Sequence, residues 1–519
     1  MQARLGGLVA AILLSSPGWG NYAPDVDQIS KTNLKAHLEF IASDLLLGRD
    51  TPSQGLDLAA RYIASHLEMY GAEPGGDNGT YFQMITLGRS VLKAEGTVCA
   101  IDGKTLELGT DYVPDTAVAG DVQGPAVFVK SGWTNAQKGI DPMKGLNLKG
   151  AIVVTDGMLP DGVARRDTFN DPNWESPAVA AKRYGAAAVV TVSGLPGGQG
   201  WKRQVDRMTQ GGRFGIQSPD RPVGVPSITV SPEVGETLKS SALNAVRAEF
   251  PPNAPTVSIK LNAVNETQTT QNVIGIIRGS DPVLKNEFVA LGAHYDHVGV
   301  GQADNRGDTI YNGADDDGSG TVAMLEIARV VAAGKRPKRS LIFVWHCGEE
   351  KGLWGSQYFA AHPTIDFSKL IIQVNMDMIG MSKKPGDTNP ANADLTDSRS
   401  IYVIGPKLIS SDITKTLTAV NDATVKMNLL DTYDTTSDPN RYYQRSDHYS
   451  YIAKGVPAIF LFSGSHENYH RPSDEVSQID FDKLQTTAKL LYAMAYEFAM
   501  QPERPRIDGP LKSLFGGTQ

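Results

Sequence analysis

The stretch Leu291-Gly-Ala-His-Tyr-Asp-His-Val-Gly299 places polar, chemically versatile side chains directly after a run of apolar residues. The apolar run begins in Glu287-Phe-Val-Ala290, and it predicts a buried strand that ends in a polar loop. Residues two positions apart on a strand face the same side. His294 and Asp296 can therefore reach one site, while Tyr295 points elsewhere.

A second stretch, Asn312-Gly-Ala-Asp-Asp-Asp-Gly-Ser-Gly320, places three consecutive carboxylates in a glycine-rich turn. The residues that follow, 319–331, carry apolar side chains at helical spacing, and Ser319 is the expected N-cap. A strand, an acidic turn and a helix in this order predict the floor of a metal site.

From about residue 270 to residue 500, the sequence alternates between apolar strands and helical patterns. The predicted strands are 273–277, 288–291, 341–345, 370–374, 401–404 and 456–461. A final amphipathic helix is predicted over 481–500. This alternation predicts an α/β fold whose mixed, largely parallel sheet is flanked by helices.

The remaining segments define the expected domains. Two helices are predicted at 32–43 and 53–70, with Gly71 as a stop. Short β-like runs between about 95 and 255 indicate a small β-rich domain inserted into the α/β domain, and its linker at 195–226 should be exposed. We expect the α/β domain at 21–95 and 256–500, the inserted domain at 96–255, and a loose C-terminal tail at 501–519.

The N-terminus has the pattern of a secretory leader. One positive charge in Met1-Gln-Ala-Arg4 precedes the apolar run Leu8-Val-Ala-Ala-Ile-Leu-Leu14 and the small residues of Gly18-Trp-Gly20. A buried or frayed helix is the alternative. We expect residues 1–20 to be a signal peptide, with the mature protein secreted or periplasmic. No other stretch has the roughly 18–20 apolar residues of a membrane span, so stable membrane insertion is not expected.

Composition narrows the functional classes. The chain has 519 residues, which suggests two or three domains, and its net charge of −8 argues against a nucleic-acid partner. The two cysteines, Cys99 and Cys347, cannot form a cysteine-based zinc motif, and we do not expect them to pair. The sequence does not indicate an oligomeric state.

Several metal-binding side chains follow the ends of predicted strands. In open α/β sheets, sites form beyond the carboxyl ends of the strands, so we expect these side chains to converge. Each one alone is more simply a turn or a cap. The set is His294, Glu349, Glu350, Asp377 and His470.

These side chains also indicate the metal. Imidazole and carboxylate ligands without thiolate suit Zn²⁺, with Mn²⁺ or Co²⁺ as alternatives. Two histidines and several carboxylates exceed one tetrahedral site, so a pair of metals that share a carboxylate is predicted.

The motifs of this region resemble those of the secreted di-zinc aminopeptidases, whose relatives include glutamate carboxypeptidase, glutaminyl cyclase and the transferrin receptor. Order and spacing agree over about 270–500. The motifs are Gly292-Ala-His-Tyr-Asp296, Asn312-Gly-Ala-Asp-Asp-Asp-Gly-Ser-Gly320, Gly348-Glu-Glu350, Gly355-Ser-Gln-Tyr358, Asn375-Met-Asp-Met-Ile-Gly380, Ser446-Asp-His448 and Tyr469-His-Arg-Pro-Ser-Asp474.

The resemblance implies a role for each of five ligands to two zinc ions. His294 and Asp377 would hold one ion, and Glu350 and His470 would hold the other. Asp316, the middle residue of its acidic run, would bridge both ions. The family often has a cis peptide bond after this aspartate.

The resemblance also implies three further roles. Glu349 would act as the general base that takes a proton from the bridging water, which leaves the attacking hydroxide, and passes that proton to the leaving amine. Asp296 would orient His294. Tyr443 would donate to the tetrahedral oxyanion, although the adjacent Tyr442 is an alternative in this loop.

Other polar residues near these motifs receive plainer interpretations. No ligand role is expected for His297, His346, His448 or His466, which should lie at the surface or support the ligands. Asp315 and Asp317 should shape the acidic turn through local hydrogen bonds. Asp474 should cap or close its loop.

The inserted region resembles a protease-associated domain. The resemblance rests on Leu148-Lys-Gly-Ala-Ile-Val-Val154, Ala180-Ala-Lys-Arg-Tyr-Gly-Ala-Ala-Ala-Val-Val190 and Val225-Pro-Ser-Ile-Thr-Val230. It implies a lid or a wall that selects substrates.

The expected activity is a zinc-dependent aminopeptidase acting on peptides. A carboxypeptidase or dipeptidase is the first alternative, because Arg441 or Arg445 could bind a substrate carboxylate. A glutaminyl cyclase would need only one zinc. A receptor-like binding protein would have lost ligands, and this chain keeps them all.

Overall fold

The computed structural model describes residues 23–515, apart from 116–117, 165–167, 169–170, 172, 194–200, 203–204, 206–213, 218–223, 245 and 247–248. The predicted signal peptide and much of the predicted linker at 195–226 lie outside the described residues. The chain forms two compact units, one from the residues up to Ile85 and from Thr269 onward, the other from Thr86–Gln268. Both boundaries fall inside strands, β2 (Phe82–Leu92) and β15 (Ala263–Ile277).

The first unit is built on a mixed sheet. From β15 onward its strands lie in the order β15-β19-β16-β20-β23-β21-β22; β2 lies on the other side of β15, and β1 (Glu73–Pro74) also pairs with β15. β19, β16, β20 and β23 are mutually parallel, whereas β15 and β21 run antiparallel to their neighbours β19 and β23. The bounds are β16 (Phe288–His294), β19 (Ser340–His346), β20 (Leu370–Met376), β21 (Ser400–Ile404), β22 (Asn428–Leu430) and β23 (Ala458–Phe462).

Every residue of β16, β19, β20 and β23 is buried. Strands that are covered on both faces read as continuous apolar runs, which is why the sequence pattern locates them well. The predicted largely parallel α/β fold is confirmed.

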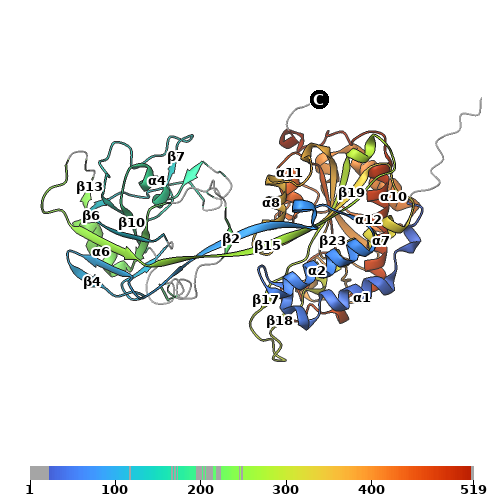
Figure 1. The fold of residues 1–519 in the computed structure, drawn as a ribbon, viewed down its shortest axis with the longest axis horizontal. Coiled ribbons are helices and arrows are strands. Elements are labelled where there is room, and N and C mark those ends of the chain that lie inside the picture. Colours follow the sequence, from blue (N-terminus) through green and yellow to red (C-terminus); the bar gives the residue numbers. More distant parts are fainter. Residues whose placement is uncertain are drawn as a thin grey trace, which may run out of the picture. The chain divides into compact units, whose positions relative to one another are not determined.

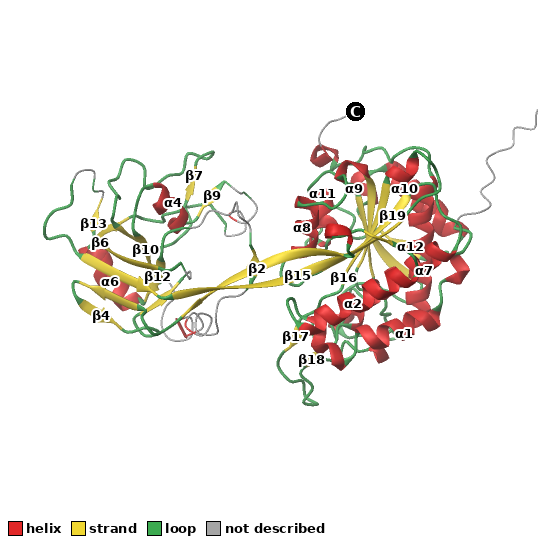
Figure 2. Ribbon diagram, viewed as in Figure 1, coloured by secondary structure: helices red, strands yellow, loops and turns green. Residues whose placement is uncertain are grey.

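Helices cover both faces of this sheet (Figure 1, Figure 2). α1, α2 and α12 pack around α7, and α7 and α12 lie on β16. α8 and α11 pack on the other face, against β19, β20 and β23. The bounds are α1 (Lys31–Ile41), α2 (Gln54–Met69), α7 (Gly320–Ala333), α8 (Trp354–Ala361), α9 (Pro406–Ile409), α10 (Ser411–Ala423), α11 (His448–Ile452) and α12 (Phe481–Met500).

The helix ends agree with the sequence in one case and differ in another. α2 stops before Gly71, whose φ of 72° is the left-handed conformation that glycine adopts readily. Ser319, in contrast, does not cap α7. Its hydroxyl donates to the carbonyl of Asp315 at 2.8 Å, and the first N–H of the helix, that of Gly320, binds Asp317 Oδ1 at 2.9 Å. The expected Ser319 cap was wrong because an irregular helical turn over Ala314–Ser319 precedes α7.

The second unit has its own sheet, in the order β4-β3-β14-β6-β8-β10-β12-β5, with β13 beside β6. β6, β8, β10 and β12 are parallel, and the flanking strands β14 and β5 are antiparallel. The bounds are β3 (Val98–Ile101), β4 (Lys104–Leu106), β5 (Tyr112–Pro114), β6 (Gly120–Phe128), β8 (Ile152–Thr155), β10 (Ala188–Val192), β12 (Ser227–Val230), β13 (Leu243–Asn244) and β14 (Thr256–Leu261).

Alternate residues of this sheet build two separate apolar cores. Val154 faces a core that includes Leu238 of α6 (Pro232–Ser241), whereas its neighbour Val153 faces a core that includes Ala180 of α4 (Pro177–Arg183). Because successive side chains on a strand point to opposite faces, both faces must be covered. This explains why the strands of the inserted region lack polar alternation.

The chain beyond α12 is held against the first unit as far as it is described. Arg504 pairs with Glu287 at 2.8 Å and Arg506 pairs with Asp412 at 2.7 Å. The N–H of Gly509 donates to the carbonyl of Ile409 at 2.9 Å. The expectation of a loose tail was therefore wrong for residues 501–515, because these pairs and backbone hydrogen bonds tie the segment down.

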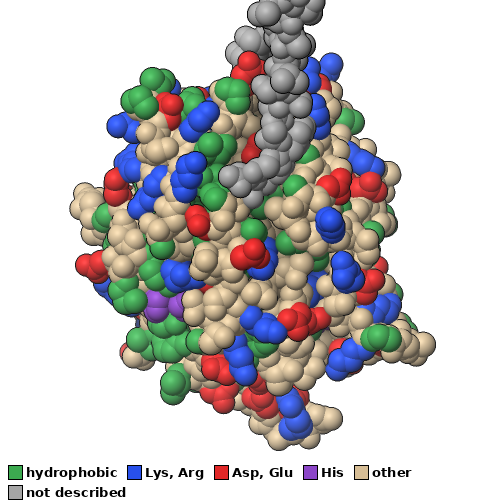
Figure 3. Space-filling model, turned by 90° about the vertical axis from the view of Figure 1, so that its right-hand side faces the viewer, with side chains coloured by type: hydrophobic (Ala, Val, Ile, Leu, Met, Phe, Trp, Pro, Cys, Tyr) green, Lys and Arg blue, Asp and Glu red, His purple; other side chains and the backbone are tan. Residues whose placement is uncertain are grey.

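Two surface properties bear on the partners. Among the described residues, none of the helices has the length and apolar character needed to cross a membrane. Acidic and basic side chains are interspersed over the face of the molecule that Figure 3 shows.

Candidate metal centre and catalytic site

The parallel strands bring the predicted site residues to one edge of the sheet. His294 is the last residue of β16, and Asp377 directly follows the end of β20. Glu349 and Glu350 follow β19, and His470 lies in the loop after β23. Since these four strands are parallel, their carboxyl ends meet, and residues far apart in sequence converge.

The acidic turn before α7 supplies Asp316. Its position is fixed by Asp474, whose carboxylate accepts the N–H groups of Asp315 at 2.9 Å and Asp316 at 3.1 Å. The peptide bond between Asp316 and Asp317 is cis, as the resemblance implies. Asp474 thus closes more than its own loop, because it also holds the acidic turn.

A first cluster forms on one side of Asp316. His294 Nε2 lies 3.1 Å from Asp316 Oδ1 and 3.6 Å from Asp377 Oδ1. All three residues are buried. Ser446 Oγ donates to Asp377 Oδ2 at 2.8 Å, which leaves Oδ1 free to face the cluster.

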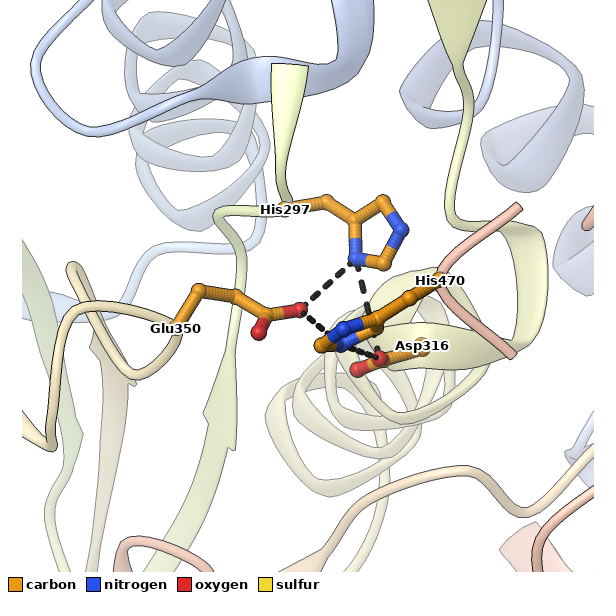
Figure 4. Close-up of side chains that lie close together, drawn as sticks. All are labelled: His297, Asp316, Glu350 and His470. Carbon is orange, nitrogen blue, oxygen red and sulfur yellow. Dashed lines mark ion pairs between the residues drawn. The ribbon is translucent and has the colours of Figure 1, made fainter. Parts of the chain in front are cut away.

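A second cluster forms on the other side of Asp316 (Figure 4). His470 Nε2 lies 3.1 Å from Asp316 Oδ2 and 3.0 Å from Glu350 Oε1. His297 Nδ1 lies 2.9 Å from the same Glu350 oxygen and 3.7 Å from Asp316 Oδ2. The side chains of these four residues point toward one another, so the two clusters share the carboxylate of Asp316.

The atoms that converge in these clusters lack ordinary partners. Within the described part of the chain, no hydrogen bond reaches the facing atoms, which are His294 Nε2, His297 Nδ1, Glu350 Oε1, Asp377 Oδ1 and His470 Nε2. Buried polar atoms are normally hydrogen-bonded, so a set of orphaned ligand atoms indicates a missing positive ion.

Electrostatics point the same way. Burial lowers the pKa of His470, but Asp316 and Glu350 outweigh this effect and raise the pKa to about 10. Burial likewise opposes protonation of His294, yet Asp377 and its other carboxylate neighbours raise the pKa well above its usual range. Both positions therefore favour positive charge, and the residues present fit a pair of divalent cations.

The acidic turn is braced by carboxylates that are not in either cluster. Asp317 Oδ2 accepts the N–H of His294 at 3.2 Å, and Asp315 Oδ1 accepts the N–H of Gly380 at 2.6 Å. From the sequence, we expected Asp315 and Asp317 to form hydrogen bonds within the acidic turn. They also reach the ends of β16 and the segment after β20, so they tie the turn to two ligand-bearing strands.

Asp296 contacts both the first cluster and Glu349. Its Oδ1 accepts the N–H of Glu349 at 3.1 Å and lies 3.6 Å from His294 Nδ1. The shorter contact of the ring is with the backbone carbonyl of Asp296, 3.1 Å from Nδ1. With Nδ1 bound there, Nε2 is the nitrogen that faces the cluster.

Glu349 lies beside both clusters, at the wall of a small cavity. Burial, together with the negative charges of Asp377, Asp447 and Glu350, holds the pKa of Glu349 well above its usual range. The cavity is lined by Asp316, Glu349, Asp377, Met378, Tyr442, Arg445, Phe460, Phe462, Ser465 and Tyr469. Carboxylates form one part of its wall and aromatic rings form another.

Tyr443, the tyrosine that the resemblance implies for the oxyanion, is not among the residues that line the cavity. Tyr443 is buried, its ring lies 6.1 Å from that of His448, and no described group bonds its hydroxyl. Tyr442 and Tyr469 line the cavity instead. The oxyanion role of Tyr443 stays a prediction.

The remaining histidines near the motifs are buried and support neighbouring groups. His346 Nδ1 lies 3.2 Å from Asp447, and His466 Nε2 lies 3.3 Å from Asp315. His448 Nε2 lies 2.9 Å from the carbonyl of Tyr443. The alternative of a surface position is excluded for all three.

Sequence reasoning missed two residues of the site. His297 was given no ligand role, although it directly follows Asp296 at the strand end, and that placement was an available signal. Arg49 is fully buried below the site, and its guanidinium donates to carbonyls of Ile41, Tyr295, Asn312 and Gly313. Nothing in the local sequence around Arg49 indicates these long-range contacts.

Comparisons with known proteins agree with this geometry. Residues 272–495 match the model of peptidase family M28. "Leucine aminopeptidase 1" of Ajellomyces capsulatus is 32% identical over 228 residues, which is 42% of this chain and 54% of that protein. "Aminopeptidase YwaD" of Bacillus subtilis is 26% identical over 291 residues, or 55% of this chain and 54% of that protein.

The chain thus spans about half the length of the curated relatives it matches. Among solved structures, the aminopeptidase from Aneurinibacillus sp. strain AM-1 aligns with a TM-score of 0.50 at 19% identity, covering 93% of this chain and 96% of that one. That likeness concerns the fold. Residues 272–495 are thus similar to peptidase family M28, and the convergent site residues agree with that similarity.

Proposed function

We propose that this protein is a zinc-dependent aminopeptidase that removes N-terminal residues from peptides. The observation that carries the proposal is the pair of ligand clusters that share Asp316, with Glu349 beside both. When bound, two zinc ions would supply Lewis acidity that polarises a peptide carbonyl and makes water nucleophilic near neutral pH. Mn²⁺ and Co²⁺ are the alternative metals for this donor set.

Glu349 is the proposed general base. It lines the cavity, and its backbone is held to Asp296 by the N–H···Oδ1 hydrogen bond of 3.1 Å. A carboxylate so placed can accept a proton from the attacking water and deliver it to the departing amine. Burial and the neighbouring carboxylates raise the pKa of Glu349, which is the direction expected of a carboxyl group that must deliver a proton as well as accept one.

The cavity wall supports recognition of a free N-terminus. Glu349 is the lining carboxylate that belongs to neither cluster, so it can face a substrate amine. Tyr469, Phe460 and Phe462 offer apolar surface for a side chain. The N-terminal residue of a peptide carries a free amine next to its side chain, so a wall with both features can bind it.

Arg445 favours a second candidate, a carboxypeptidase or dipeptidase. Its side chain lines the same cavity, and a guanidinium can bind a carboxylate through two hydrogen bonds. Arg441, the other arginine of this loop, is not among the lining residues. Arg445 is therefore the residue on which this alternative depends.

We further propose that the second unit is a protease-associated domain and that the protein acts outside the cytoplasm. The leader-like residues 1–20 support export. The parallel β-rich sheet covered by α4 and α6 supports an inserted accessory domain. N-terminal sequencing of the exported protein tests the leader.

Mass spectrometry of a mixed peptide pool tests the activity. The pool contains matched peptides with free or acetylated N-termini and with free or amidated C-termini, incubated with the zinc-loaded protein. We expect stepwise loss of N-terminal residues only where the amine is free. Trimming that requires a free C-terminus would overturn the proposal. If Arg445→Met then lost that trimming, the protein would be a carboxypeptidase that binds the substrate carboxylate through Arg445. No cleavage of any peptide would favour a binding protein.

A further inference from the structure

His297 belongs to the second cluster, but it is not among the five ligands that the family resemblance implies. It lies in the loop directly after β16, is fully buried, and faces Glu350, Asp316 and His470 (Figure 4). We propose that His297 is a fourth protein ligand for the metal ion held by Asp316, Glu350 and His470. This inference rests on the proposed zinc site and adds a residue to it.

The contact between His297 and Glu350 does not have the form of a hydrogen bond. Nδ1 lies only 2.9 Å from Glu350 Oε1, yet within the described residues neither atom has a hydrogen-bond partner. Atoms in this relationship are typical of two ligands that point at a common ion.

The spacing of the ligand atoms supports the same conclusion. Ligands about 2.0–2.1 Å from a tetrahedral zinc ion lie roughly 3.3 Å from one another. The measured separations in the second cluster are 2.9 Å (His297–Glu350), 3.0 Å (His470–Glu350), 3.1 Å (His470–Asp316) and 3.7 Å (His297–Asp316). They scatter around the separation that a tetrahedral ion requires.

The surrounding fold holds His297 in this place. Its N–H donates to the carbonyl of Arg49 at 3.2 Å. Gly313 packs so closely that a Cβ there would lie 2.5 Å from Cγ of His297. The other ring nitrogen, Nε2, also lacks a partner among the described residues, so no hydrogen bond competes for the ring.

The proposal makes the two metal positions unequal. Four protein ligands, namely His297, Asp316, Glu350 and His470, complete a tetrahedral shell, as in sites that hold zinc permanently. The first cluster offers only His294, Asp316 and Asp377, which leaves a position open, as in catalytic sites. We therefore expect the second cluster to bind zinc first and more tightly.

Zinc titration of the metal-free, full-length protein tests this order. Wild-type protein should bind two ions in two steps. His297→Asn should weaken one step by more than about 100-fold, beyond the roughly 10–100-fold that loss of a merely orienting neighbour causes. The other step should be retained. His37→Asn is the matched control, because the buried ring of His37 on α1 contacts Tyr62 and Tyr70 and belongs to neither cluster, and it should leave both steps unchanged.

Diffraction from the zinc-loaded wild type keeps the proposal falsifiable if the variant fails to fold. Anomalous scattering should place an ion about 2.0–2.1 Å from His297 Nδ1. An ion bound by Glu350 and His470 with His297 more than 3 Å away, or unchanged affinities in His297→Asn, would overturn the proposal while leaving the two-zinc site intact. Absence of zinc binding by the wild type would overturn this proposal together with the proposed function.

Discussion

Oδ2 of Asp474 accepts the backbone N–H of Asp316 at 3.1 Å, and this hydrogen bond joins two loops that are far apart in sequence. Asp474 follows His470 in the loop after β23, and Asp316 belongs to the turn before α7. The bond therefore sets the distance between the shared carboxylate and His470. Asp474 therefore acts on the candidate metal centre although it belongs to neither cluster.

Substitution of Asp474 should weaken metal binding. In Asp474→Asn, the amide group would replace an oxygen that now accepts an N–H, so the acidic turn would lose part of its anchor. We expect zinc affinity to fall by about 10–100-fold. Equilibrium dialysis against a zinc buffer measures it. Asp482→Asn, at the exposed start of α12, is the control, and equal affinities in the two variants would contradict the account.

Arg49 should contribute strongly to the stability of the first unit. Arg49→Met leaves the carbonyls of Ile41, Tyr295, Asn312 and Gly313 without their buried donor. We expect the free energy of unfolding to fall by about 3–5 kcal/mol, because several buried acceptors become unsatisfied together. Urea denaturation measures this loss for Arg49→Met and for the control Arg506→Met. The control removes the exposed ion pair between Arg506 and Asp412, which contributes less than about 1 kcal/mol. Equal losses would contradict the role of Arg49.

His37 should make stability depend on pH. Burial and the charge of His66 lower the pKa of His37 to about 4, so the folded state prefers the neutral ring. The stabilisation is fully present above the unfolded pKa of about 6.5, and it is lost as the pH falls toward 4.

Between pH 7 and pH 5 this loss amounts to about 2 kcal/mol. The free energy of unfolding, measured at both values for wild type and His37→Gln, isolates the contribution. The wild type should lose about 2 kcal/mol more than the variant, since other titrating groups are common to both. Parallel pH dependences would show that His37 is not responsible.

Removal of metal should affect stability as well as activity. Ligands that bind only the folded state stabilise it by about 4 kcal/mol at a thousandfold excess over the dissociation constant. We expect a chelator to abolish peptide cleavage and to lower the melting temperature, and added Zn²⁺ to restore both. Calorimetry with and without chelator measures the shift. An unchanged melting temperature would indicate that the clusters hold no ion.

The sequence predicts the strands and helices of the first unit well, because each of them has a local pattern of apolar residues. The strands that end at the site are continuous apolar runs, and the polar residue at each end stands out against them. The parallel arrangement then follows from their alternation with helices. His294, Glu350 and Asp377 converge for this reason, whereas Asp316 comes from the turn before α7 and His470 from the loop after β23.

Other features depend on contacts that no local pattern encodes. Arg49 binds carbonyls of segments more than two hundred residues away, and Asp474 binds the turn around Asp316. Ser319 looks like an N-cap, but its own backbone angles are already helical, and Asp317 accepts the N–H of Gly320 instead. Likewise, only the folded structure shows that His297 faces Asp316 and Glu350, whereas His346, His448 and His466 belong to neither cluster.

The central claim is that Glu349 is the base of a metal-dependent peptidase, and the turnover of Glu349→Gln tests it most directly. The kcat for a peptide with a free N-terminus and the zinc content are measured on the same samples of wild type and variant. We predict that kcat falls by about 10²–10⁴-fold while two zinc ions remain bound, because Glu349 belongs to neither cluster. A variant that keeps its zinc and retains kcat within about tenfold of the wild type would contradict the account.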